Sequence, residues 1–163
     1  MFLGMSFLVF VHVVISLVAI GAGFVVAAGL LHAHLQGRIT ALFLAMTALT
    51  CLSGFILPAS AFLPSHATGI VTMIVFAIAV YARYSKHLAG AWRWIYAVAA
   101  VLCLYLNVFV LVVQAFLKVP ALKDLAPTGA EPPFQIAQAI VLVLFVALMI
   151  AAARKFRPAP ALA

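Results

Sequence analysis

The sequence predicts an all-α integral membrane protein, a bundle of five transmembrane helices with its N-terminus outside and its C-terminus inside. The first observation behind this prediction is composition: 69% of the 163 residues are hydrophobic, 7% are charged, and the mean hydropathy is +1.36. Water-soluble domains need a polar surface and do not have such a composition. The second observation is that the apolar residues form five runs, each long enough to cross a bilayer. The third is the distribution of positive charge among the connections.

The five apolar runs make up one domain that covers residues 1–157. We expect helices at about 7–31, 39–57, 65–84, 92–117 and 133–153. The first run lacks the positive start and the small-residue cleavage pattern of a signal peptide, so we expect it to be a retained helix. Pro132 and Pro133 suit the first turn of the last helix, where proline is favoured. The Ala- and Pro-rich tail at 158–163 is expected to be disordered.

The charged residues give the predicted topology. Lysine and arginine are concentrated in the first connection, the third connection and the C-terminal segment, whereas the second connection has neither. These basic residues are Arg38, Arg83, Lys86, Arg93, Arg154, Lys155 and Arg157. With five spans, all three segments fall on one side, and the positive-inside rule makes that side cytoplasmic. The net charge of +7 is therefore expected to anchor the protein at the lipid bilayer and not to bind nucleic acid.

The run at 92–117 has a polar face inside an otherwise apolar helix. Its polar residues follow one another at spacings of four and seven, which place them on one side of a helix. They are Tyr96, Cys103, Asn107, Gln114 and Lys118. Polar groups inside a bilayer turn toward protein or water. We therefore expect this helix to be the central element of the bundle.

Polar residues from four of the five predicted helices meet in the predicted outer half of the membrane. The candidate cofactor-binding residues are His12, His66, Asn107 and Gln114. The candidate substrate or pathway residues are Lys118, Glu131, Gln135 and Gln138. Such residues are costly inside a membrane and point to a functional site. Each of them alone also fits a role in helix packing or in hydrogen bonds between helices.

Two histidines suggest a metal or haem site. Imidazole is a usual axial ligand of haem, and His12 and His66 lie at comparable depth on helices that run in the same direction. They could ligate one metal ion or the two faces of a haem. The sequence has no Cys-x-x-Cys-His motif, which excludes ordinary covalent c-type haem. The predicted cofactors are haem b or a quinone. Cys51 and Cys103 fall near mid-membrane, where buried cysteines act mostly as small hydrophobes.

Two resemblances to known families bear on these expectations. Leu104-Tyr-Leu-Asn-Val-Phe-Val, Lys118-Val-Pro-Ala-Leu and Glu131-Pro-Pro-Phe resemble segments of an uncharacterised group of small bacterial polytopic membrane proteins. That resemblance implies a multi-pass protein of the bacterial inner membrane and no particular mechanism. Val11-His12, followed by Gly21 and Gly23, is similar to the first helix of copper-resistance-D and HemJ-type membrane proteins. In those families a bundle histidine is linked to haem b, which implies the same role for His12. The tryptophan that often precedes the glycines there is absent here.

The sequence leaves three function classes open. The leading hypothesis is an outward-facing polar pocket that binds a redox cofactor for membrane electron transfer. The first alternative is a small transporter or channel for an ion or small solute. The second is an accessory subunit of a larger membrane complex, with a second copy or another membrane protein as partner. The sequence lacks the P-loop, Gly-x-Ser-x-Gly and His-Glu-x-x-His motifs, and whether the protein is an enzyme stays open.

Overall fold

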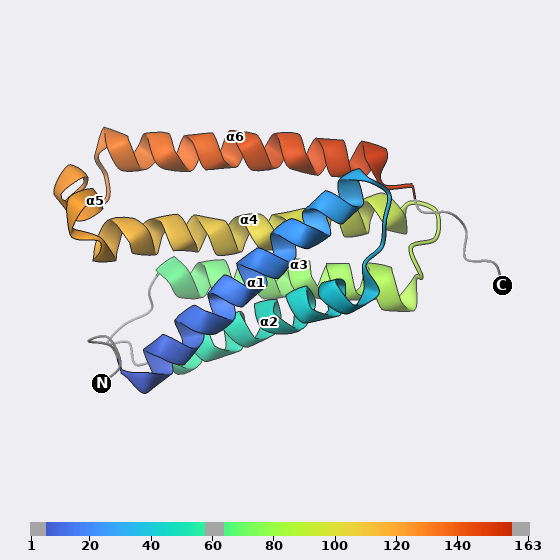
Figure 1. The fold of residues 1–163 in the computed structure, drawn as a ribbon, viewed down its shortest axis with the longest axis horizontal. Coiled ribbons are helices and arrows are strands. Elements are labelled where there is room, and N and C mark those ends of the chain that lie inside the picture. The colour runs from blue at the N-terminus through green and yellow to red at the C-terminus, as the bar shows by residue number, and fades with distance from the viewer. Residues whose placement is uncertain (1–5, 58–63, 158–163) are drawn as a thin grey trace.

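The computed structural model describes residues 6–57 and 64–157 and folds them into helices alone (Figure 1). The elements in chain order are α1 (Phe7–Leu31), α2 (Gly37–Ile56), α3 (Pro64–Val80), the π-helical turn η1 (Tyr81–Ser85), α4 (Trp92–Lys118), α5 (Pro120–Leu125) and α6 (Pro132–Lys155). Within the described residues, five helices of 20 to 27 residues are long and apolar enough to cross a membrane, with α3 and η1 forming one of them. This confirms the predicted all-α bundle of five long apolar helices.

The helix boundaries agree with the sequence prediction to within about three residues, as is usual for helix ends. α1 has the predicted bounds, whereas α2 begins two residues earlier, at Gly37. The prolines occupy the first turn of α6, as expected, because proline has no N–H that would need a partner there. The short helix α5 was not predicted, and it too begins with a proline. The predicted disordered tail at 158–163 lies outside the described residues.

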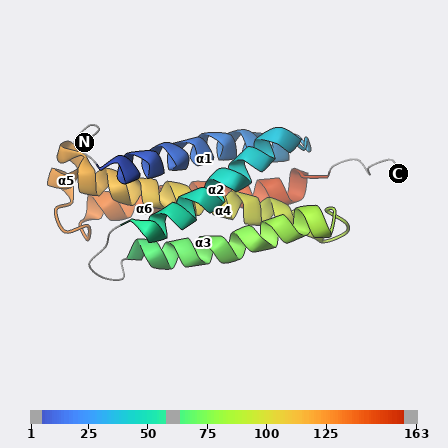
Figure 2. The same cartoon turned by 90° about the horizontal axis from the view of Figure 1, so that it is seen from below.

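α4 lies at the centre of the bundle and packs against α1, α3 and α6, while α2 packs between α1 and α3 (Figures 1 and 2). The first part of its polar and small face is buried, and that part includes Tyr96, Ala100, Cys103 and Asn107. Another side of the helix packs against α6, where Tyr105 contacts Phe145 with ring centroids 5.6 Å apart. The prediction that this helix is the central element is therefore confirmed by its packing.

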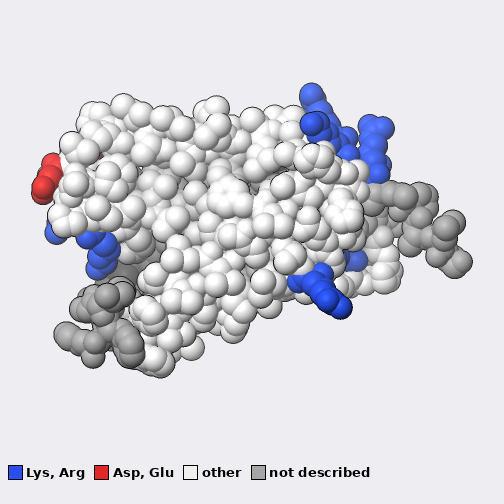
Figure 3. All heavy atoms as spheres, in the orientation of Figure 1, with Lys and Arg blue, Asp and Glu red and all other residues white. Residues whose placement is uncertain are grey.

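The two ends of the bundle differ in charge. We call the end that carries α5 and the starts of α1 and α6 the α5 end, and the opposite end, with the connections after α1 and η1, the basic end. On the face seen in Figure 3, lysine and arginine lie at both ends, the long middle has none, and acidic residues lie at the α5 end. The sequence has two acidic residues, Asp124 and Glu131, and both belong to the α5 end.

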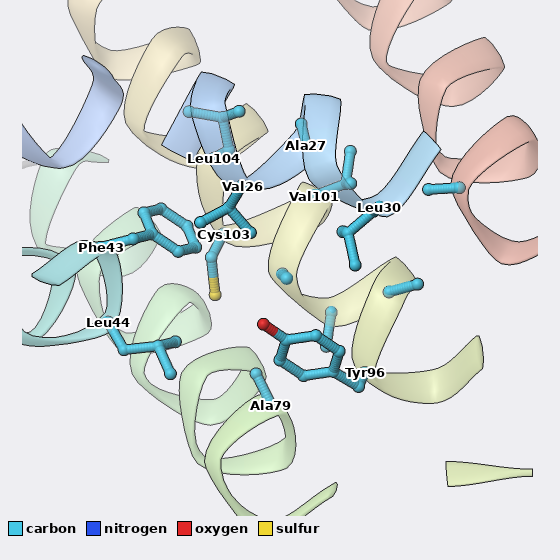
Figure 4. Close-up of a cluster of buried hydrophobic side chains, with 14 of the residues drawn as sticks. Val26, Ala27, Leu30, Phe43, Leu44, Ala79, Tyr96, Val101, Cys103 and Leu104 are labelled. Atoms are coloured by element: carbon cyan, nitrogen blue, oxygen red, sulfur yellow. The ribbon is translucent and has the colours of Figure 1, made fainter. Parts of the chain in front are cut away.

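The tightly packed core lies in the half of the bundle nearer the basic end. It includes Leu30, Phe43, Tyr96 and Leu104, all nearly inaccessible (Figure 4). By contrast, no residue from the N-cap Ser6 to Val18 is buried, and the buried part of α1 begins at Ala19. The half nearer the α5 end is therefore more open, and most of the candidate site residues lie there.

Candidate functional site

His12 faces the neighbouring helix α2, a helix that the sequence analysis did not include in the site. Its Nδ1 lies 2.7 Å from Oγ of Ser53, and the ring is half-buried. The ring also lies beside Gly54, where a Cβ would be in ordinary van der Waals contact, 3.5 Å from Cε1 of His12. Sequence reasoning did not single out Ser53. The signal that could have found it is a hydroxyl in the last turn of the second predicted helix.

The contacts of Ser53 favour one tautomer of His12. The Ser53 hydroxyl lies 2.6 Å from the carbonyl oxygen of Leu49, a short distance that favours donation of its proton to that oxygen. A hydroxyl has one proton, so Ser53 Oγ then accepts from the imidazole. In this tautomer, which satisfies both contacts, His12 carries its proton on Nδ1 and Nε2 presents a lone pair.

Asn107 is buried in the middle of α4 and joins α4 to α2. Its Nδ2 donates to the carbonyl oxygen of Cys103 over 3.2 Å and reaches Oγ1 of Thr47 at 3.5 Å. The first bond lies within its own helix, and the second is at the limit of a hydrogen bond. Asn107 thus acts as a polar link between two helices.

His66 lies at the start of α3 and packs on a different residue of α2. Its ring stacks on Phe55, with ring centroids 5.8 Å apart and planes inclined by 14°. His12, in comparison, contacts Ser53 and Gly54. The two histidine rings thus contact different residues of α2. In the described part of the chain, no group of three or more His, Cys, Asp or Glu residues is arranged to hold a metal ion.

Gln114 and Lys118 are exposed in the last turns of α4, and Gln138 lies half-buried between α4 and α6. Gln138 Nε2 donates to the carbonyl oxygen of Phe109 over 3.2 Å, while its Oε1 is buried and has no partner among the described residues. The Gln138 amide thus contacts the facing helix α4. It joins α6 to the central helix.

Glu131 is the N-cap residue of α6, and Gln135 lies in the first turns of that helix. Glu131 accepts hydrogen bonds from N and Oγ1 of Thr128, at 3.1 and 2.8 Å, and from N of Ala130 at 3.1 Å. The Thr128 hydroxyl in particular holds the pKa of Glu131 below its usual value. Gln135 Nε2 donates to the carbonyl oxygen of Ala130 over 2.7 Å. These two side chains fix the turn that leads into α6.

Cys51 and Cys103, which the sequence places near mid-membrane, are both buried free thiols. Cys103 belongs to the core cluster that includes Phe43 and Leu104.

Comparison with known proteins gives no family assignment: the chain matches no protein-family model, and no curated protein or solved structure is significantly similar to it. The side chains of the described residues are therefore the basis for inferring a function. Among them, His12 is distinctive, because one nitrogen is fixed by a hydrogen bond and the other presents a lone pair.

Proposed function

We propose that this chain is a multi-pass protein of the bacterial inner membrane, with its N-terminus outside and its C-terminus inside, that binds a redox cofactor for membrane electron transfer. The cofactor is haem b or a quinone, and His12 is its main ligand. The observation that carries the proposal is the tautomer of His12, with Nδ1 donating to Ser53 and a lone pair on Nε2. Histidines that ligate a metal have this arrangement, in which a partner on one nitrogen orients the other.

Of the two cofactors, haem b fits the donor set better. The Nε2 lone pair of His12 is a ligand for iron, whereas the carbonyl of an oxidised quinone needs a hydrogen-bond donor. The same lone pair could accept a proton from a quinol hydroxyl, so the reduced form also fits. Haem b supplies one-electron transfer when bound. The role of His12 is to hold and orient the cofactor at the α5 end.

The open half of the bundle supports a bulky apolar ligand there. Residues 7–18 of α1 bury none of their side chains completely, and Phe7, Leu8, Val14 and Leu17 are exposed. Leu8 lies one helical turn before His12 on the same face of α1, so an apolar ring system next to His12 would cover it. Phe7, Val14 and Leu17 lie on other faces of the helix.

The experiment is an absorption spectrum of the purified protein in mild detergent, recorded oxidised and reduced, with quinone extraction of the same sample. We expect a Soret band that His12→Ala abolishes. His32→Ala is the matched control, because His32 lies at the far end of the same helix and its Nδ1 bonds only to the carbonyl oxygen of Ala28. Absence of both haem and quinone from the wild-type protein would overturn the proposal, as would an unchanged spectrum of the His12 variant.

His66→Ala separates two forms of the proposal. The sequence favours His12 and His66 as a pair of axial ligands, and such a pair gives a low-spin haem that the His66 variant loses. The stacking of His66 on Phe55 favours His12 as the single protein ligand, and then His66→Ala leaves the spectrum unchanged. Absorption spectra of the reduced His12→Ala and His66→Ala variants, recorded as haem is added, distinguish the two forms of the proposal.

The transport alternative has less support, because its pathway residues are engaged elsewhere. Glu131 and Gln135 bond to residues of the connection before α6, and Asn107 bonds to Cys103 and Thr47. Liposome flux that Asn107→Leu abolishes would favour transport over cofactor binding. For an accessory subunit, His12→Leu should leave function intact, whereas substitutions on the outer helix faces should break co-purification.

A further inference from the structure

The π-helical turn η1 brings a cationic side chain against the start of α4. The backbone N–H of Lys86 bonds to the carbonyl oxygen of Tyr81 over 3.0 Å, a five-residue step that widens the helix at this point. Tyr81 packs edge-on against Trp92, with ring centroids 5.2 Å apart, and fastens the turn to α4. Single π-helical turns of this kind often mark functional sites. Here the turn places Arg83 over the first turns of α4.

The Arg83 guanidinium lies between aromatic rings and lacks hydrogen-bond acceptors. Its carbon Cζ is 5.4 Å from the ring centre of Tyr84 and 5.7 Å from that of Tyr96. Its Nε and Nη1 are buried and have no acceptor among the described residues. The ring faces stabilise the charge but do not replace hydrogen bonds. Buried donors of a charged group without acceptors are costly, so an acceptor is missing from this place.

Two neighbouring groups share this lack. Nε of Arg93, in the first turn of α4, is also buried without an acceptor. Tyr96, one helical turn further on, is fully buried, and its hydroxyl points into the core (Figure 4). That hydroxyl lies near Arg83 and Thr40, but it makes no hydrogen bond of full geometry to either. Arg83, Arg93 and Tyr96 thus each have a buried polar atom without a hydrogen-bond partner among the described residues.

Neither acidic side chain of the sequence lies at this junction. Asp124 and Glu131 both belong to the α5 end, across the length of the bundle. Lys86 adds a further positive charge, with Nζ 5.3 Å from the ring centre of Tyr81 and 5.9 Å from that of Trp92. The junction is therefore a cluster of cations without an acidic side chain beside it, which favours an anionic ligand.

We propose that the junction of η1 and α4 binds the phosphate of an acidic phospholipid, with Arg83 and Arg93 as ligands and Lys86 beside them. The planar guanidinium fork matches phosphate geometry and can donate two parallel hydrogen bonds. Arg83 is half-buried as a whole, so part of its side chain reaches the surface where a headgroup lies. Exposed Tyr81 and Tyr84 belong to the same turn as Arg83, at the level where aromatic residues meet headgroups. This site is independent of the cofactor proposed for the α5 end.

The test measures lipid retention by the full-length protein in detergent. The probes are phosphatidylglycerol, phosphatidylcholine and inorganic phosphate, each followed by native mass spectrometry and by thermal unfolding. We expect phosphatidylglycerol to be retained and to raise the unfolding temperature, while phosphatidylcholine and free phosphate do neither. Arg83→Gln should weaken retention about fivefold, as expected for loss of one cation–headgroup contact. Lys155→Gln removes an equal charge from an exposed position at the same end and should change little.

Other results would overturn the proposal in defined ways. Equal retention of the two lipids, or equal losses in Arg83→Gln and Lys155→Gln, would mean a general charge effect and no site. A rise in the unfolding temperature with inorganic phosphate alone would mean that the site binds a free anion and not a lipid. If a co-purifying protein restores stability without lipid, the two arginines contact a protein partner and not a lipid. If Arg83→Gln fails to fold, Arg83→Lys keeps the charge without the fork, and full retention by that variant would contradict the proposed bidentate contact.

Discussion

The Nδ1 of His12 on α1 lies 2.7 Å from Oγ of Ser53 on α2, and this hydrogen bond links the two helices where the bundle is most open. Because the short contact of Ser53 with Leu49 favours donation of the Ser53 proton there, the bond also favours protonation of His12 on Nδ1. One contact therefore contributes both to packing and to the chemistry available at Nε2.

Ser53→Ala should weaken cofactor binding while leaving His12 in place. Without its partner the imidazole loses its fixed tautomer and orientation, and loss of such a partner typically lowers metal affinity by about tenfold or more. Titration of cofactor-free protein with haem, followed at the Soret band, measures the effect. Ser16→Ala is the control, since the Ser16 hydroxyl donates to the backbone oxygen of His12 and does not contact the ring. Equal affinities of the two variants would contradict the role given to Ser53.

Two glycines of α1 provide a matched test of helix packing. A Cβ on Gly23 would lie 2.6 Å from Cδ1 of Leu104 and 2.9 Å from Cε2 of Phe43, and both of those side chains are buried in the core. Gly23→Ala should therefore lower the free energy of unfolding by about 1–3 kcal/mol, the usual cost of overpacking. A Cβ on Gly21 has no atom within 4 Å, so Gly21→Ala should be neutral or slightly stabilising. Unfolding in mixed micelles measures both, and equal stabilities would argue against this packing.

The link between Asn107 and Thr47 should be weak. At 3.5 Å the contact is long, and hydrogen bonds between membrane helices average about 0.6 kcal/mol in double-mutant cycles. A cycle of Asn107→Leu and Thr47→Val, read by unfolding in detergent, should give a coupling energy of about that size. A coupling energy above about 2 kcal/mol would show that Asn107 does more than link two helices.

The turn before α6 should respond to acid through Glu131. Its pKa is lowered below the usual value of 4.5, chiefly by the hydrogen bond from Thr128, so ionised Glu131 favours the folded turn. That contribution is present above pH 4.5 and is lost as the pH falls through the lowered pKa. The amide proton shifts of Thr128 and Ala130, which both donate to Glu131, should titrate together in acid. In Glu131→Gln they should stay flat, and independent titration of the two amides would contradict the shared carboxylate.

Most of the fold could be predicted because the bilayer restricts it. Backbone groups in hydrocarbon must be bonded within a helix, so five long apolar runs lead directly to five long helices. The central position of α4 also follows from its sequence, since its polar face turns inward from Tyr96 to Asn107, although Gln114 and Lys118 at its end are exposed. The α5 helix was missed, because a six-residue segment in a Pro-rich connection has too short a pattern to indicate a helix.

The candidate site could be predicted only in part. Depth along a helix follows from residue number, because each residue adds a fixed rise. The partner of each side chain depends on how the helices rotate against one another, which side-chain packing decides. For this reason Glu131 and Gln135 were expected to line a pocket but bond within their own turn. Tyr96, which the sequence analysis assigned only to the polar face of its helix, lies beside the guanidinium of Arg83.

The sequence by itself determined that this is an all-helical protein with five long apolar helices, because length and hydrophobicity are properties of the chain alone. Only the tertiary structure decided which polar groups have partners. The pairing of His12 with Ser53 joins residues 41 positions apart, and Arg83 reaches Tyr96 through a π-helical turn that no periodicity indicates. Both relationships depend on distances between helices, and packing fixes those distances.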